Sequence, residues 1–236
     1  MRNVVTIAKR ELQAYFVSPI AYVVTAAFLA VTGYLFSLIL YYSREATMRY
    51  MFLNMTTIFL LIAPVLTMRL LAEEQSKGTM ELLLTSPVRD WEVVTGKYLA
   101  SVALLVVMLA LTAYYPILLN VYGEPDAGPL WSGYLGLFLL GSTLLSLGLL
   151  TSAVTSNQIV AAVLGFALVL IFWLLGGLSG FASGKLQNLV NYLDLSTHFM
   201  DFTRGVIDSK DIVYFLSVIA GSLFLTTRIL ETRRWR

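Results

Sequence analysis

The sequence predicts an all-α polytopic membrane protein with six transmembrane helices. Apolar residues make up 58% of its 236 residues and charged residues only 13%, whereas soluble domains carry about 25% charged residues. The mean hydropathy of +0.79 agrees with this composition. Six apolar runs are each long enough to cross the roughly 30 Å of hydrocarbon in a bilayer. We therefore expect membrane lipid to be the main solvent and one partner of the chain.

The same composition excludes several functional classes. The net charge of +2, with no basic patch apart from the membrane flanks, argues against nucleic-acid binding. The chain has no cysteine and one histidine, which excludes disulfides and thiolate metal sites and argues against a histidine-based metal site. The first apolar run exceeds the roughly 7–15 residues of a signal-peptide core, so we expect a retained membrane helix.

The whole chain, 1–236, is expected to form a single transmembrane domain. Its spans are expected at about 20–42, 52–71, 95–120, 131–154, 158–180 and 211–229. Pro64 and Pro116 lie inside two of these spans, which neighbouring helices can tolerate in a membrane. Only residues 155–157 separate the fourth span from the fifth, so we expect a helical hairpin there.

Lysine and arginine residues near the span ends predict the orientation. Eleven of the 16 fall on the side that carries both termini and the loop at 72–94. The other five are Arg44, Arg49, Lys185, Arg204 and Lys210. Because cytoplasmic loops are enriched in Lys and Arg, we expect both termini in the cytoplasm. The loop that contains Glu124 and Asp126 has no cation and fits the outer side.

Residues 1–19 are expected to form an amphipathic helix in the cytoplasmic interface. Ser18 and Pro19 end it, and one helical stripe is apolar. The residues of this stripe are Val5, Ala8, Leu12, Tyr15 and Phe16. A plain positively charged anchor that only fixes topology would need the same residues, so both interpretations stay open.

The loop at 72–94 is the most organised polar segment of the chain. Residues 69–76 are expected to extend the second span as helix, which Gly78 ends. Thr79 can then cap a short helix over 80–84, and a Ser-Pro pair stops it. A helix this short is marginal alone, so its three leucines need a surface to pack against. We favour a docking element for a soluble partner over a solvated connecting loop, because cap, helix and stop follow in order.

Residues 181–210 form a second organised segment, expected on the outer side. Their apolar residues fall into two stripes, which predicts two short amphipathic helices with breaks at Leu195–Ser196 and at Gly205. Three aspartates recur every seven residues within this segment, and we interpret them as hydrated surface carboxylates rather than a metal site, because the breaks separate them. They are Asp194, Asp201 and Asp208.

Small residues mark the end of the fifth span. Gly176, Gly180 and Gly184 are spaced by four. Such spacing favours tight helix–helix packing, within the chain or across a dimer.

Motifs that carry chemistry are sparse. Gly96-Lys97-Tyr98 lacks the upstream glycine and the following hydroxyl of a phosphate-binding loop, so we do not expect this chain to bind ATP by that route. Gly177-Leu178-Ser179-Gly180 resembles the motif of rhomboid intramembrane serine proteases, which is a competing hypothesis. The single histidine, His198, lies in the outer segment, and no sequence feature places it within hydrogen-bond reach of Ser179. We therefore predict no catalytic residue.

The loop at 72–94 and both chain ends resemble the permeases of ABC-2 type ATP-binding-cassette (ABC) exporters. The specific part is the run Glu73-Glu-Gln-Ser-Lys-Gly-Thr-Met-Glu-Leu-Leu-Leu-Thr-Ser-Pro-Val88, followed by Val93-Val-Thr-Gly-Lys97. Arg10-Glu11-Leu12 and Phe16-Val-Ser-Pro19 resemble the N-terminal interfacial helix of that family. His198-Phe199 and Arg204-Gly-Val-Ile-Asp208 resemble its gliding-motility-type branch. The resemblance covers essentially the whole chain.

This resemblance implies a half-transporter in a bacterial or archaeal cell inner membrane. It would export an unidentified substrate together with a second permease subunit, the same or a related chain, and two separate ATPase subunits. ATP and magnesium would bind to the ATPase, whereas this chain would bind no cofactor or metal and would not be an enzyme. The short helices of 181–210 would shape an outer gate. A variant of this hypothesis is a subunit that relays ATPase motion without passing a substrate.

The resemblance also implies candidate site residues. The coupling helix and its flank, which would dock into the ATPase, comprise Glu73, Glu74, Thr79, Met80, Glu81, Leu82, Leu83 and Leu84. A second ATPase contact on the N-terminal helix would comprise Lys9, Arg10 and Glu11. Packing across the permease dimer would use Gly176, Gly180 and Gly184.

Overall fold

The computed structural model describes residues 2–43, 45–79, 88–178 and 184–234. All regular structure in these ranges is helical, which confirms the prediction of an all-α polytopic membrane protein. The helices are α1 (Arg2–Val17), α2 (Pro19–Ser43), α3 (Arg49–Ser76), α5 (Asp90–Thr112), α6 (Tyr114–Tyr122), α7 (Ala127–Val154), α8 (Gln158–Leu178), α9 (Lys185–Leu193), α10 (Leu195–Thr203) and α11 (Ser209–Arg234).

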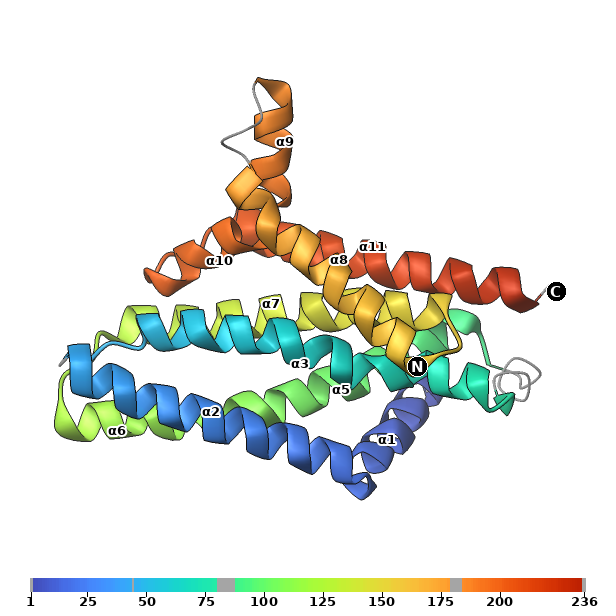
Figure 1. The fold of residues 1–236 in the computed structure, drawn as a ribbon, viewed down its shortest axis with the longest axis horizontal. Coiled ribbons are helices and arrows are strands. Elements are labelled where there is room, and N and C mark those ends of the chain that lie inside the picture. Colours follow the sequence, from blue (N-terminus) through green and yellow to red (C-terminus); the bar gives the residue numbers. More distant parts are fainter. Residues whose placement is uncertain (1, 44, 80–87, 179–183, 235–236) are drawn as a thin grey trace.

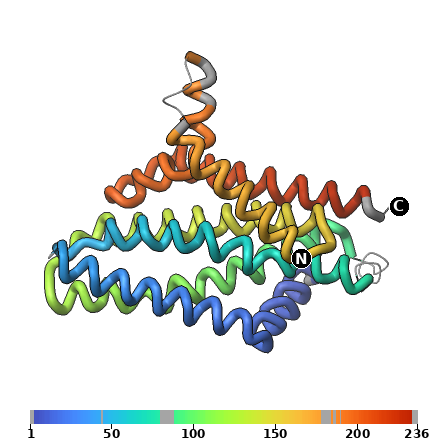
Figure 2. Tube along the Cα trace, in the orientation of Figure 1, coloured from blue at the N-terminus to red at the C-terminus, as the bar shows by residue number. Residues whose placement is uncertain are grey.

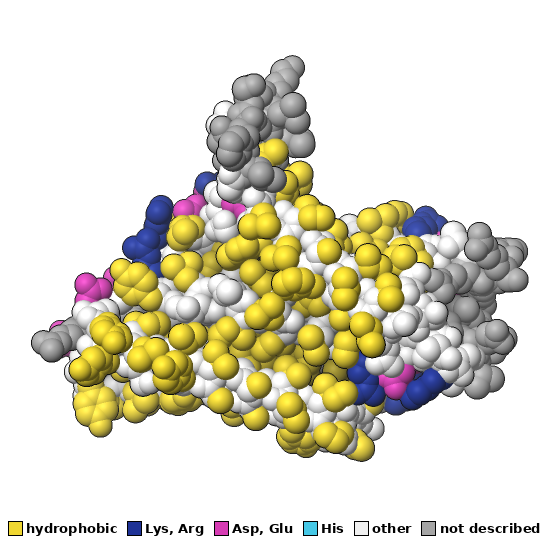
Figure 3. Space-filling view, in the orientation of Figure 1, with side chains coloured by type: hydrophobic (Ala, Val, Ile, Leu, Met, Phe, Trp, Pro, Cys, Tyr) yellow, Lys and Arg dark blue, Asp and Glu magenta, His cyan; other side chains and the backbone are white. Residues whose placement is uncertain are grey.

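Six of these helical segments in the described residues are long and apolar enough to cross a membrane: α2, α3, α5 continued by α6, α7, α8 and α11. The spanning helices run lengthwise through the bundle, with both chain ends at one end of it (Figure 1). We call this end the terminal end, and the opposite end, where α6 turns into α7, the distal end. Hydrophobic side chains cover much of the flank, and charged side chains gather near the two ends (Figure 3). This arrangement is typical of a bilayer-spanning protein.

Helix α7 forms the centre of the bundle and is the most buried of the six spans. Its small residues let neighbouring helices approach. A Cβ atom at Gly148 would collide with Thr67 of α3, and one at Gly141 would lie 2.8 Å from a methyl carbon of Leu105 on α5. Close backbone approach through small residues is the usual means of packing helices in membranes. The core is therefore organised around α7.

The break between α5 and α6 has a local cause. Pro116 has no N–H, so it cannot donate to the carbonyl oxygen of Thr112, four residues earlier. The hydroxyl of Tyr134 on α7 donates to this oxygen instead, at 2.9 Å. A neighbouring helix thus satisfies the carbonyl group that the proline leaves free, as a membrane interior requires. By contrast, α3 continues through Pro64 without interruption.

The segment between α8 and α11 contains the two short helices expected there. Helix α9 stands away from the bundle, and α10 returns to pack against α7 (Figure 2). The predicted break at Leu195–Ser196 is displaced by one residue, because Asp194 is the N-cap of α10 and accepts from the backbone N–H groups of Ser196 and Thr197. Its interpretation as a hydrated surface carboxylate was wrong, since Asp194 is 1% exposed. The backbone N–H and hydroxyl groups of Ser196 and Thr197 satisfy its oxygens in this buried position.

Packing at Gly148 yields a stability prediction. Replacing Gly148 by Leu forces a side chain into the space of Thr67 and should cost about 2 kcal/mol of folding free energy. The melting temperature of the purified protein in detergent should fall by roughly 4–8 °C. Gly221→Leu on α11 is the matched control, because nothing described lies within 4 Å of a Cβ at that position. Equal melting temperatures for the two variants would contradict the packing of α3 on α7.

Candidate functional site

A network of ion pairs joins α1, α3 and α5 at the terminal end. Its centre is Lys97 of α5, whose side chain is 1% exposed. The Nζ atom lies 3.0 Å from Oε1 of Glu11 on α1 and 2.8 Å from Oε1 of Glu74 on α3. A buried ammonium group is costly unless it is paired and hydrogen-bonded. Two carboxylates from two other helices meet that requirement, so Lys97 holds three helices together.

The sequence brings α1 and α5 together at two further points. Gly96 leaves room for α1, because a Cβ there would lie 2.8 Å from the side chain of Ile7. The carboxylate of Glu92 accepts from the backbone N–H of Arg89 at 3.0 Å, which caps the start of α5. It also accepts from the side-chain amide of Asn3 at 3.2 Å. The start of α1 is therefore bound to the start of α5.

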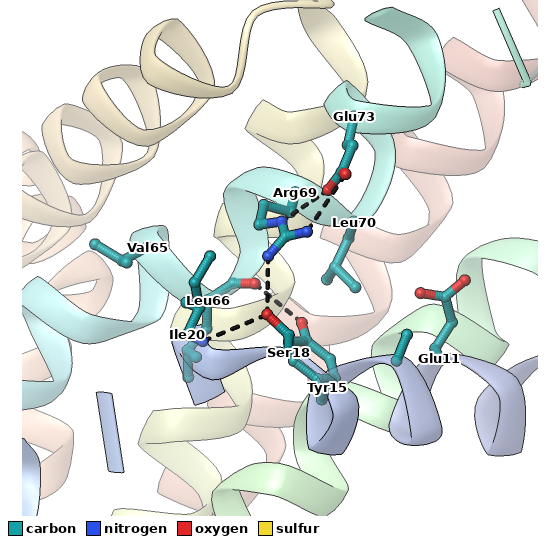
Figure 4. Close-up of a pocket in the computed structure, with 10 residues that line it drawn as sticks. Glu11, Tyr15, Ser18, Ile20, Val65, Leu66, Arg69, Leu70 and Glu73 are labelled. Atoms are coloured by element: carbon teal, nitrogen blue, oxygen red, sulfur yellow. Dashed lines mark hydrogen bonds and ion pairs between the residues drawn. The ribbon is translucent and has the colours of Figure 1, made fainter. Parts of the chain in front are cut away.

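The corner between α1 and α2 is bound to α3 (Figure 4). Nε of Arg69 donates to Oε2 of Glu73 at 2.7 Å, and Nη1 donates to Oγ of Ser18 at 3.2 Å. The hydroxyl of Tyr15 donates to the carbonyl oxygen of Leu66 at 2.9 Å. Burial, with a smaller contribution from the charge of Glu11, raises the pKa of Tyr15, while Arg69 opposes this rise. The phenol therefore stays protonated and keeps donating.

Two of the acidic residues predicted to contact a partner, Glu73 and Glu74, are bound within the chain. Glu73 accepts from Arg69 and, at 2.6 Å, from Lys77. Glu74 pairs with Lys97, and it also lies 3.5 Å from Nη2 of Arg10. Glu74 thus holds α3 against α1 and α5, whereas Glu73 binds Arg69 of its own helix and Lys77 at the C-cap of that helix.

Other predicted contact residues are placed differently. Lys9 and Arg10 are exposed on α1, whereas Glu11 points to Lys97. Thr79 is the last described residue before the gap, and its hydroxyl donates to the carbonyl oxygen of Glu74 at 3.4 Å. The rest of the predicted coupling helix lies outside the described residues. These residues are Met80, Glu81, Leu82, Leu83 and Leu84.

A hydroxyl that the sequence did not reveal joins α3 to α7. Oγ of Ser152 accepts from the backbone N–H groups of Leu71 and Ala72 and donates to the carbonyl oxygen of Met68. The side-chain amide of Gln75 donates to the backbone of Ala153 at 3.1 Å. Serine inside an apolar helix gives no signal of its partner, so this contact could not be predicted. The last turns of α3 are thereby bound to the central helix.

A second polar cluster lies where α10 meets α11. Nδ1 of His198 is 2.6 Å from Oδ1 of Asp211, and Nε2 is 3.0 Å from the carbonyl oxygen of Tyr192. The ring stacks on that of Tyr214 with centroids 4.0 Å apart. Because a carbonyl oxygen only accepts, Nε2 carries a hydrogen. The contact between Nδ1 and Asp211 then holds one more proton, so the buried pair is neutral overall.

This geometry does not form the dyad of the competing protease hypothesis. In a dyad, one ring nitrogen of His198 must accept a proton from the nucleophile. Both nitrogens instead contact Asp211 and Tyr192. Ser179 lies outside the described residues. Among the described residues, no group of three His, Asp or Glu side chains could hold a metal ion.

The predicted glycine stripe has one clear contact inside the chain. At Gly176, the space of a Cβ atom is filled by the carboxylate of Asp194. Gly184 has a φ of +62° at the start of α9, with nothing within 4 Å of its Cβ position, and Gly180 lies outside the described residues. Packing of these glycines across a dimer stays a prediction.

The ion-pair network predicts the effect of removing its centre. Lys97→Met removes the buried cation between Glu11 and Glu74 and leaves only the exposed Arg10 beside them, which should destabilise the fold by about 3 kcal/mol. Amide hydrogen exchange in α1 should become faster, because α1 loses the ion pair between Glu11 and Lys97. Lys9→Met is the matched control, since Lys9 is exposed on the same helix. Unchanged exchange in α1 of the Lys97 variant would show that the network does not hold this helix.

The buried histidine pair predicts an asymmetry between its two partners. Asp211→Asn should be tolerated, because an amide can donate to Nδ1 of a neutral His198 while Nε2 still donates to Tyr192. His198→Leu leaves a carboxylate that is 1% exposed without its partner and should cost about 3–5 kcal/mol. Thermal unfolding in detergent measures both variants. Similar losses in the two would contradict the assigned protons.

Comparison with known proteins places this geometry in a family. A family model described as ABC-2 family transporter protein matches residues 5–233. Two relatives, each named a probable multidrug ABC transporter permease YbhR, come from Escherichia coli strain K12 and Escherichia coli O157:H7. Each is 32% identical over 154 residues, which is 64% of this chain and 40% of the relative. The chain thus spans about two fifths of the length of the curated relatives it matches.

The gliding-motility-type branch stays a prediction, because these matches do not separate branches. The family itself is established by a match that extends over nearly the whole chain. It is a family of membrane subunits of transporters, which agrees with the six apolar spans. As the sequence resemblance predicted, the chain belongs to the ABC-2 family of transporter proteins.

Proposed function

We propose that this chain is the membrane-spanning subunit of an ABC exporter and works with a second permease subunit and two separate ATPase subunits. Family membership supports the class of function. The word multidrug occurs in the name of the relatives, which are much longer than this chain. We therefore assign no substrate to this chain. The observation that carries the mechanism is the ion-pair network around Lys97, which includes the predicted docking residue Glu74.

The network offers a path for force from an ATPase to the membrane helices. Helix α3 runs without a break from the distal end to Ser76, and residues 80–84 follow soon after in the chain. A pull on that segment acts on Glu74, and through Lys97 on α1 and α5. Ser152 extends the same connection to α7. Packed helices that share such contacts move as one body rather than deforming separately.

This proposal places the terminal end in the cytoplasm of a bacterial or archaeal cell. Arg10, Arg69, Lys77 and Lys97 all lie in the network at this end, which agrees with the enrichment of Lys and Arg on the cytoplasmic side. A subunit that relays ATPase motion without passing a substrate would use the same network. The two functions are distinguished by whether transport accompanies ATP hydrolysis in reconstituted vesicles.

The absence of cysteine from the sequence allows a direct test of orientation. Single cysteines can be introduced as Thr79→Cys at the terminal end and Glu124→Cys at the distal end. In intact cells, a membrane-impermeant maleimide should label the Glu124 variant and should label the Thr79 variant only after the membrane is opened. The reverse pattern would overturn the proposed orientation.

Docking is tested by comparing two aspartate substitutions. Leu83→Asp should abolish recovery of an ATPase subunit with a phosphate-binding loop when the chain is purified from its native membrane, because a carboxylate cannot enter an apolar groove. Ile207→Asp is the matched control, since Ile207 is an exposed apolar residue at the distal end. Equal ATPase recovery with both variants, at equal expression, would count against docking through residues 80–84.

A further inference from the structure

We propose that the groove between the α5–α6 bend and α7 is a binding site for one acyl chain of a bilayer phospholipid. The groove has a volume of about 580 Å³, within the range of roughly 300–1,000 Å³ found for ligand pockets. It is lined by side chains of α5, α6 and α7, and none of its lining residues is charged. It lies away from both polar clusters described above.

The groove exists because α6 departs from the line of α5. Pro116 interrupts the helix, and Tyr134 both binds the carbonyl oxygen of Thr112 and forms part of the groove wall. Beyond the break, α6 is attached to α2. The hydroxyl of Tyr115 donates to Oγ1 of Thr32 at 2.8 Å, and Gly123 approaches Ala46 closely. With α6 held toward α2, a gap opens between α6 and α7.

The length of the groove matches one leaflet of a bilayer. Its lining extends along the chain from Val106 to Asn120, which at a rise of 1.5 Å per residue is about 21 Å. Half of a hydrocarbon core is roughly 15 Å thick, and the interfacial region on that side adds several more ångströms to the thickness. On the terminal side of the groove, Leu105 packs directly on Gly141 and closes the space between α5 and α7. The groove therefore covers the distal leaflet alone.

The polarity of the lining changes along the groove. Val106, Leu109 and Phe138 line its deep end, whereas Asn120 and Trp131 lie at the distal end. The side chain of Trp131 is 79% exposed, as is typical of tryptophan at the level of lipid head groups. An amphiphile with its tail toward the bilayer centre and its head group beside Trp131 fits this gradient. A partner's transmembrane helix would need a contact surface through both leaflets, which this groove does not offer.

Photo-crosslinking in the full-length protein tests the site. The probe is a phosphatidylethanolamine with a diazirine in the middle of one acyl chain, incorporated into nanodiscs with the protein. Labelled peptides should come mainly from 106–138 in the native sequence. Ala110→Phe places a ring in the groove from an exposed lining position and should lower labelling of these peptides roughly tenfold. Ala220→Phe, on the exposed face of α11, is the matched control and should leave labelling unchanged.

A second measurement does not depend on the folding of the Ala110 variant. Trp131 is made the single tryptophan by replacing Trp91, Trp173 and Trp235 with phenylalanine, and its fluorescence is quenched by lipids brominated in the acyl chain. A resident lipid should keep quenching Trp131 after dilution into unbrominated detergent micelles. Immediate loss of quenching, equal labelling in both alanine variants, or crosslinks from this face to a second copy of the chain would each overturn the proposal.

Discussion

The need to satisfy every polar group inside a water-free bilayer decides the details of this bundle. Proline removes a donor from the α5–α6 helix, and the hydroxyl of Tyr134 replaces it. Ser152 binds three backbone groups of α3 at once. Lys97 enters the bundle only with two carboxylates beside it. In each case a polar group on one helix requires a particular neighbour, so these few contacts select which apolar helices lie together.

The same requirement changes how the acidic residues of the loop at 72–94 are interpreted. Viewed in the sequence, Glu73 and Glu74 are an acidic pair open to a partner, but in the structure each is bound to cations of its own chain. In the proposed force path, the contribution of Glu74 is mechanical, because it joins the end of α3 to α5 through Lys97. A partially buried pair is suited to this task, since separating its charges costs far more than separating an exposed pair.

Much of the architecture could be predicted from the sequence, because hydrophobic length and small residues are local properties. The six spans and the stop at Gly205 follow from such signals. The break between α5 and α6 was not predicted, and Pro64 shows that a proline alone does not cause one. The partners of the buried polar side chains do not follow from such local signals. The sequence did not show that Lys97 and Asp194 are buried, because burial depends on helices distant in the sequence. Predicted contacts of residues 80–84 fall outside the described structure.

The two ends of the α5–α6 span carry different constraints, and the break at Ala113 lies between them. At the terminal end, α5 is attached to α1 and α3 through Lys97; beyond the break, α6 is attached to α2 through Tyr115. A rigid-body shift of α5 therefore changes its angle to α6 rather than carrying α6 with it. The groove beside Tyr134 lies at this angle. In the proposed force path, movement of α5 would therefore change the width of the groove, and the proposed acyl chain would resist this change.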